Sequence, residues 1–356
     1  MVNGNSPAPR RRVSVGIWLA ICSFLVAAMV LLGGATRLTD SGLSIVDWKP
    51  LTGWIPPLTD AAWQKLFDAY KQTSEFQKQN FWMTATDFRS IYWLEYLHRV
   101  LGRVIGIVFF LPFLWFLIRG QLGGGLWWRC LLVFLLGGAQ GYLGWYMVQS
   151  GLVDRTDVSQ YRLAAHLSLA VIIYMALLWL TLRCLRPRPT GGRKRLGFHT
   201  GFLVLLVFLT MAAGAFVAGI DAGLAYNSFP LMDGRYIPQG WLQMSPVWLN
   251  FFENTATVQF VHRQLGLLVV AIALLLWLRS RWAGPGRAAC RAIDLTFAFA
   301  ILQMCLGIAT LLAEVPILFG ILHQAGAMCV LTFALWSLYE LAAIDGRRAN
   351  RTAPRM

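Results

Sequence analysis

The stretch WLEYLHRVLGR, residues 93–103, opens an apolar run long enough to cross a lipid bilayer, yet it carries four ionisable side chains. These side chains are Glu95, His98, Arg99 and Arg103. A near copy, VQFVHRQLGL, occupies residues 258–267 and keeps the order His-Arg-x-Leu-Gly. Ionisable groups inside a membrane are costly and usually mark a functional site, so the repeated stretch bears on both fold and function.

The composition of the 356-residue chain is that of a polytopic membrane protein. Hydrophobic residues make up 57% of the chain, charged residues only 13%, and the mean hydropathy is +0.57. A soluble domain carries about 25% charged residues. The pI of about 10.1 could indicate nucleic acid, but the basic residues lie in short loops between apolar runs, as membrane topology requires. We therefore expect a lipid bilayer around the chain and no nucleic-acid partner.

Eight apolar runs reach the length of a membrane-spanning helix, about 20 residues. The sequence predicts an all-α polytopic membrane protein with eight transmembrane helices, at 14–36, 91–118, 127–148, 163–183, 199–219, 257–278, 292–312 and 317–341. The first run is too long for the apolar part of a signal peptide, so we expect it to be retained as a helix. No Arg- and Ser-rich transit segment precedes it, which favours a bacterial source.

Lysine and arginine predict the orientation. They gather before the first span, after the last one, and in the loops that follow each even-numbered span. By the positive-inside rule this side is cytoplasmic and both termini lie on it. The long loops at 37–90 and 220–256 then face the opposite side, which in a bacterial inner membrane is the periplasm.

The two halves of the chain resemble one another, which indicates an internal duplication. GGATRLTDSGLS at 33–44 resembles AGAFVAGIDAGLA at 213–225, and the third span shares with the seventh a Gln-x-x-Leu-Gly pattern, at 140–144 and 303–307. Four spans separate the copies, so both run in the same direction. This predicts two pseudo-symmetric four-helix bundles, with the halves at 1–190 and 191–356.

Four of the five histidines fall one on each even-numbered span, where we expect them within roughly two turns of the outer helix end. They are His98, His166, His262 and His323. A single helical histidine is more often a packing residue. Four histidines, one on each even-numbered span and in matching places of the two halves, are not expected by chance. Two histidines on facing helices can ligate a haem iron, and no carboxylate or cysteine cluster suggests zinc or di-iron instead. We predict bis-histidine haem in each half.

Residues near the histidines fit a porphyrin. The position four residues after each histidine is small enough to leave room for the ring plane, although small residues are also common where membrane helices touch. These positions are Gly102, Ala170, Gly266 and Ala327. Arg99 and Arg263 directly follow their histidines and could pair with haem propionates, or could instead reach lipid headgroups.

At this point the sequence resembles the haem A synthase family over nearly its whole length. The resemblance rests on GGATRLTDSGLSIVDWKPLTGWIPPL, EYLHRVLGR, QGYLGWYMVQSGL and YRLAAHLSLA. Because the outer loops contain no cysteine, the chain looks like the cysteine-free branch shared by proteobacterial and mitochondrial members.

The resemblance implies an enzyme that oxidises a porphyrin ring methyl of haem O to a formyl group, giving haem A for cytochrome oxidase. It implies that His262 and His323 hold a permanent haem b, and that His98 and His166 hold the haem being modified. It also implies haem O synthase as the source of substrate and a redox partner that the sequence does not name. A homo-oligomer is compatible with it.

Glu95 distinguishes the two copies, because the second copy has Gln259 in its place. Glu95 and His98 are three residues apart and share a helix face. Oxidising a methyl group removes protons and develops positive charge at carbon, so a carboxylate there could act as a base or as an electrostatic partner. We predict that Glu95 is catalytic; the alternative is that it only pairs with Arg99.

Two other classes of protein compete with the synthase. A dihaem cytochrome b that only transfers electrons would have the same histidines, but it gives little reason for the difference between Glu95 and Gln259. A transporter built from repeats would place broken helices and polar groups at the membrane midplane. The polar groups here lie towards the outer face.

Overall fold

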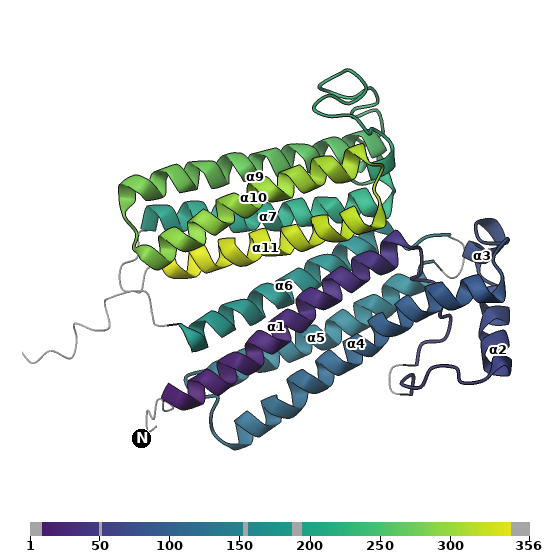
Figure 1. Ribbon diagram of the computed structural model, residues 1–356, viewed down its shortest axis with the longest axis horizontal. Helices are drawn as coiled ribbons and strands as arrows, with labels where there is room; N and C mark the ends of the chain where they lie inside the picture. The colour runs from purple at the N-terminus through teal and green to yellow at the C-terminus, as the bar shows by residue number, and fades with distance from the viewer. Residues whose placement is uncertain (1–8, 50–51, 152–155, 187–193, 343–356) are drawn as a thin grey trace, which may run out of the picture.

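Eight long helices make up most of the computed structural model, which describes residues 9–49, 52–151, 156–186 and 194–342 (Figure 1). They are α1 (Pro9–Leu38), α4 (Ala85–Ile118), α5 (Leu126–Gln149), α6 (Gln160–Leu185), α7 (Lys194–Gly219), α9 (Thr255–Ala283), α10 (Arg287–Leu312) and α11 (Ile317–Leu341). Within the described residues, these eight are the helices long and apolar enough to cross a membrane. The predicted fold class and number of spans are thereby confirmed.

Helix α4 starts earlier than the apolar run indicates, at Ala85 rather than near residue 91. A capping box explains this start: the Thr84 hydroxyl accepts from the Asp87 backbone amide, and the Asp87 side chain accepts from the Thr84 amide. His98 therefore lies roughly three and a half turns into its helix, and the expectation of about two turns was wrong for this histidine. The other three histidines do lie within about two turns of a helix start.

The same pattern of helix neighbours occurs in each half. α1 and α5 each pack against both α4 and α6, and α7 and α10 each pack against both α9 and α11. Between the halves, α6 packs against α7 and α11 packs against α1, while α6 and α11 touch each other. This pattern is compatible with two pseudo-symmetric bundles side by side (Figure 1). The predicted boundary at 190/191, and the basic segments at 187–193 and 343–356 used for orientation, lie outside the described residues.

The two long loops lie at one end of the bundle, which we call the loop end (Figure 1). The first loop contains two short helices, α2 (Asp60–Tyr70) and α3 (Ser74–Lys78). The second contains η1 (Ala222–Leu224), η2 (Val247–Leu249) and α8 (Asn250–Glu253). The first loop has an apolar core with the start of α4, made by Ile45, Phe67, Tyr70, Phe88, Ile91 and Tyr92. This core fixes the loop on the helix that carries His98.

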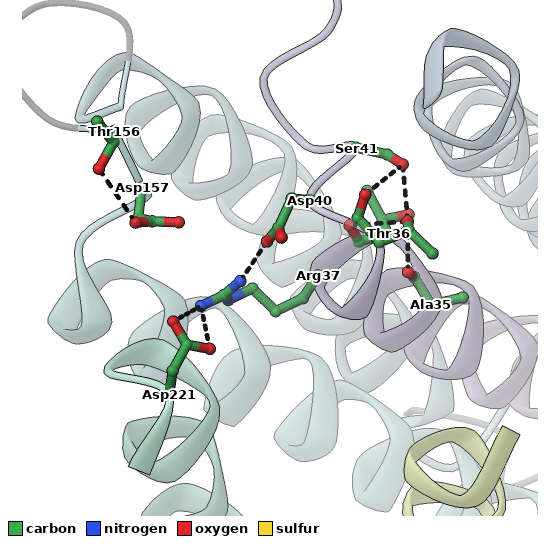
Figure 2. Close-up of polar contacts among 9 residues, drawn as sticks. Ala35, Thr36, Arg37, Asp40, Ser41, Thr156, Asp157 and Asp221 are labelled. Carbon is green, nitrogen blue, oxygen red and sulfur yellow. Dashed lines mark hydrogen bonds and ion pairs between the residues drawn. The ribbon is translucent and has the colours of Figure 1, made fainter. Parts of the chain in front are cut away.

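Arg37, near the loop-end terminus of α1, links the two halves (Figure 2). Its Nη1 donates to Asp40 at 2.6 Å, and its Nη2 donates to both carboxylate oxygens of Asp221 at 3.0 and 3.1 Å. Asp40 and Asp221 occupy equivalent places in the repeat, and both adopt left-handed backbone conformations, with φ of 48° and 51°. Ala218 stands where the second half would have its own arginine. One guanidinium thus serves two equivalent carboxylates.

Glu75 is a buried carboxylate within the first loop, only 2% exposed, and its Oε2 has no hydrogen-bond partner in the described part of the chain. Burial raises the pKa of Glu75 from an ordinary 4.5 to about 8. A hydrogen bond from Tyr70 opposes this rise in pKa, and the charges of Asp40, Glu95 and Asp157 add to it. The folded loop therefore favours the protonated form of Glu75.

Glu75→Gln should remove much of the pH dependence of thermal stability between about pH 5 and about pH 8. The unfolded chain loses this proton above its ordinary pKa of 4.5 and the folded chain keeps it to about pH 8, so the stability of the wild type falls as pH rises through this window. Melting temperatures of the detergent-purified protein, followed by tryptophan fluorescence, would show a flatter profile and a higher value at pH 8 for the variant. Asp68→Asn, at an exposed carboxylate of α2, should keep the wild-type slope. An identical slope in Glu75→Gln would contradict the assignment.

Candidate functional site

Each of the four candidate ligand histidines lies against a glycine of a neighbouring helix. The pairs are His98 on α4 with Gly33 on α1, His166 on α6 with Gly144 on α5, His262 on α9 with Gly214 on α7, and His323 on α11 with Gly307 on α10. A Cβ atom built on any of these glycines would lie 2.8 to 3.0 Å from the imidazole Cε1 atom. A side chain at these positions would have to displace the ring, so the close approach favours glycine.

The histidine pair of the second half is spaced so that His262 and His323 could hold a haem iron between them. The ring centroids of His262 and His323 are 6.3 Å apart. Metal–imidazole bonds are about 2 Å long, so this separation accommodates an iron atom bonded to a nitrogen of each ring. His262 Nδ1 lies 3.1 Å from the carbonyl oxygen of Thr210. A carbonyl oxygen only accepts, so Nδ1 carries the proton and the neutral ring keeps Nε2 free to bind a metal.

Gln140 and Gln303, which begin the repeated Gln-x-x-Leu-Gly pattern, each lie beside a histidine. Gln140 Nε2 is 3.2 Å from Nδ1 of His166, and Gln303 Nε2 is 3.1 Å from Nδ1 of His323. Each glutamine lies one turn before the glycine that faces its histidine, which is the sequence signal that could have identified it. Each amide nitrogen also lies 3.3 to 3.4 Å from Nε2 of the same histidine. An amide nitrogen only donates, so in this orientation it competes with a metal for the ring nitrogens. The opposite amide orientation would present Oε1, which is buried without a partner among the described residues, to a protonated Nδ1 and leave Nε2 for a metal.

His98 differs from the other three histidines. Its buried Nδ1 atom has no hydrogen-bond partner among the described residues. Leaving a buried polar atom unpaired costs free energy, so the imidazole of His98 has an open position for a bound group. An open ring nitrogen of this kind suits a haem, and the pairing of His98 with His166 stays a prediction.

Glu95 is almost completely buried, with 3% exposure, and its carboxylate is held from two sides. Its Oε2 accepts from the Ser44 hydroxyl at 2.7 Å and from the Ile45 backbone amide at 2.8 Å. Its Oε1 accepts from both Nε, at 3.0 Å, and Nη2 of Arg99. A carboxylate offers about four acceptor positions, and here all of them are used. This is the hydrogen-bonding pattern of a fixed, ionised group.

Arg99 and Arg103 hold the first loop on α4. Arg99 donates to the carbonyl oxygens of Asp47 at 2.8 Å and of Ile45 at 2.7 Å, and its guanidinium lies 4.8 Å from the ring of Trp48. Arg103 donates to the carbonyl oxygen of Lys49 in the same loop, at 2.7 Å. With Glu95, these arginines form a stripe of residues four apart on one helix face. The predicted pairing of Arg99 with a haem propionate stays a prediction beside these contacts.

The second half repeats this arrangement with one chemical difference. Arg263 donates to the carbonyl oxygens of Tyr226 and Ser228, which follow Asp221 at the same intervals as Ile45 and Asp47 follow Asp40. Gln259 contacts Arg263 through its Oε1 and donates from Nε2 to Tyr226 at 3.4 Å. The position equivalent to Ser44 is Ala225. The second half therefore has the same anchoring arginine but neither the carboxylate nor the hydroxyl.

The glycines one turn deeper than the histidines have different surroundings. A Cβ atom on Gly266 would meet no atom within 4 Å, whereas one on Gly102 would touch the Met29 side chain at 3.5 Å. The space around Gly266 is consistent with the clearance expected for a porphyrin. At Gly102 the flexible end of Met29 borders the same space, and clearance there remains a prediction.

Comparisons with known proteins agree over nearly the full chain. Residues 16–335 match the family model COX15-CtaA, described as cytochrome oxidase assembly protein. A protein of Nitrosospira multiformis named Heme A synthase is 48% identical over 335 residues, which cover 92% of this chain and 93% of the relative. A Heme A synthase of Parvibaculum lavamentivorans is 46% identical and covers 92% and 94% of the two chains. One from a Bradyrhizobium strain is 48% identical and covers 94% and 93%.

Gly307→Ala should displace the imidazole of His323, because the added methyl group would lie 2.8 Å from its Cε1 atom. We expect a loss of about 1–3 kcal/mol of stability, typical of overpacking, together with less haem bound per chain. Melting temperature and absorbance of the purified protein measure the two effects. Gly138→Ala on α5 is the matched control, since its methyl group would meet nothing within 4 Å. Equal melting temperatures and haem contents in the two variants would contradict the close approach.

Proposed function

The chain belongs to the COX15-CtaA family of cytochrome oxidase assembly proteins, and from this premise we propose that it is a haem A synthase. This enzyme is a multi-pass membrane oxidoreductase that converts haem O to haem A by oxidising a porphyrin ring methyl to a formyl group. The observation that carries the proposal is the similarity, over nearly the full length, to proteins named Heme A synthase. The eight membrane-spanning helices and the four histidine–glycine pairs support it.

The second half holds the cofactor in this proposal, as a haem b ligated by His262 and His323. When bound, haem b supplies one-electron transfer to or from the reaction. The separation of the two rings and the contact of His262 Nδ1 with Thr210 support this role. The residues of this half bind and orient the haem. Gln259 stands where the first half has Glu95, so this position offers no negative charge for chemistry on the ring.

The first half holds the substrate, haem O, between His98 and His166. Glu95 is three residues before His98 on α4, so a haem held by His98 would lie near its carboxylate. Oxidation of a ring methyl develops positive charge at that carbon, and a fixed negative charge nearby stabilises it. Because all acceptor positions of Glu95 are used, we assign it an electrostatic role rather than that of a mobile base.

Orientation and partners follow from charge and chemistry. The basic loops support an orientation with both termini in the cytoplasm and the loop end at the periplasmic face of a bacterial inner membrane. Arg99 and Arg263 lie at that end and remain the candidates for contact with haem propionates, beside Gly102 and Gly266 for clearance of the ring. Haem O would arrive from the haem O synthase of the same membrane, and an electron donor or acceptor would act at the loop end.

Expression of the chain in cells that make haem O but no haem A tests the function directly. Haem extracted from their membranes and separated by chromatography should contain haem A. A chain that binds only haem b and yields no haem A would instead be a dihaem electron carrier. An empty vector and the variant His98→Ala serve as controls, and neither should give haem A.

Glu95→Gln should lower haem A formation by roughly a hundredfold, the effect of removing one preorganised electrostatic group. The haem b of the second half should remain, because His262 and His323 are untouched. Gln259→Glu is the matched exchange in the other copy and should leave the rate of haem A formation within about twofold of wild type, because no substrate reacts there. A normal yield of haem A from Glu95→Gln would refute the catalytic assignment.

A further inference from the structure

Ser44 is a buried loop residue, 3% exposed, and its hydroxyl donates to Glu95 Oε2 at 2.7 Å. We propose that Ser44 is a positioning residue for the reaction: it fixes the Glu95 carboxylate at the edge of the substrate haem. The proposal rests on the proposed function for the role of Glu95, and on the contacts between loop and helix for the role of Ser44.

Fixing the carboxylate requires more than one anchor. The terminal torsion of a glutamate side chain is broad, so a carboxylate held at one oxygen can still turn about its own axis. Arg99 holds Oε1, while Ser44 and the Ile45 amide hold Oε2 from a different element of the chain. Without the hydroxyl, Oε2 would keep one donor and an unfilled acceptor position in a buried site. Ser44 therefore restricts both the direction and the solvation of the charge.

The second half shows that the hydroxyl is not needed to attach the loop. Arg263 makes the equivalent bonds to its own loop, and the helix and loop are joined there although Ala225 stands in place of Ser44. The hydroxyl is thus present in the half that has the carboxylate and absent in the half that has the amide. A role in holding the loop would apply equally to both halves, whereas a role in holding the carboxylate applies only to the first.

Ser44 also has a second acceptor within reach, the Ile91 carbonyl oxygen at 3.5 Å. In the variant Glu95→Gln the Ser44 hydroxyl therefore keeps an acceptor. The comparison of this variant with the double variant is then not affected by a buried hydroxyl without a partner. This geometry makes the pair suitable for a double-mutant cycle.

Ser44→Ala should lower the turnover of haem O by about tenfold or more, the effect of losing one hydrogen bond to a charged group, with little change in KM. Ser44→Thr, which keeps the hydroxyl, should restore most of the turnover. The double variant Ser44→Ala/Glu95→Gln should be no slower than Glu95→Gln alone. Ala225→Ser, the reverse exchange in the second half, should leave turnover unchanged. An unchanged turnover in Ser44→Ala, or additive losses in the double variant, would overturn the proposal.

Infrared difference spectroscopy gives a readout that does not depend on turnover. The carboxylate band of Glu95, assigned by its absence in Glu95→Gln, should shift in Ser44→Ala and stay in place in Ser23→Ala. Ser23 is also buried, but its hydroxyl donates to the Leu19 carbonyl of its own helix. An unshifted band in Ser44→Ala would overturn the proposal. If the wild type made no haem A, the proposed function would fail, and the band would still decide whether Ser44 holds Glu95.

Discussion

Arg99 bonds at once to Glu95 and to the carbonyl oxygens of Ile45 and Asp47, and the loop end of the first half depends on this contact. Charged groups among apolar helices must find their partners within the protein, because the bilayer offers none. The loop provides them: carbonyl oxygens for the arginines, and a hydroxyl and an amide for the carboxylate. Charged residues are therefore tolerated on α4 because helix and loop form one hydrogen-bonded unit.

Comparison of the two halves distinguishes residues that hold the structure together from residues that could take part in a reaction. Both halves have the arginine that binds loop carbonyls, the glycine that admits each imidazole, and a glutamine beside the second histidine. These features are common to the two halves and carry no information about a reaction. Two of the differences lie together, with Glu95 and Ser44 in the first half and Gln259 and Ala225 at the equivalent positions of the second. Of the two similar halves, only the first therefore has a carboxylate at this position.

The sequence was sufficient for the spans, because they leave a direct pattern, and the same patterns led to the prediction of the histidine pairs. Bilayer thickness sets the length of an apolar run, and duplication places His98 and His262 in matching stretches. The start of α4 was missed because a capping box acts through hydrogen bonds and leaves no trace in hydropathy. The partners of Arg99 could not be predicted either, because backbone carbonyls have no sequence signature. The short helices α2 and α3 of the first loop were not predicted, because hydropathy identifies only helices long enough to cross the membrane.

The single guanidinium of Arg37 has a consequence for how such a chain can be assembled. It lies between Asp40 and Asp221, which hold equivalent places in the two halves, and it bonds to both. The second half has Ala218 in place of the arginine, so the counter-charge of Asp221 comes from the first half. Two copies of the second half would bring two aspartates together without this arginine. The second half therefore depends on the first for the cation at this junction.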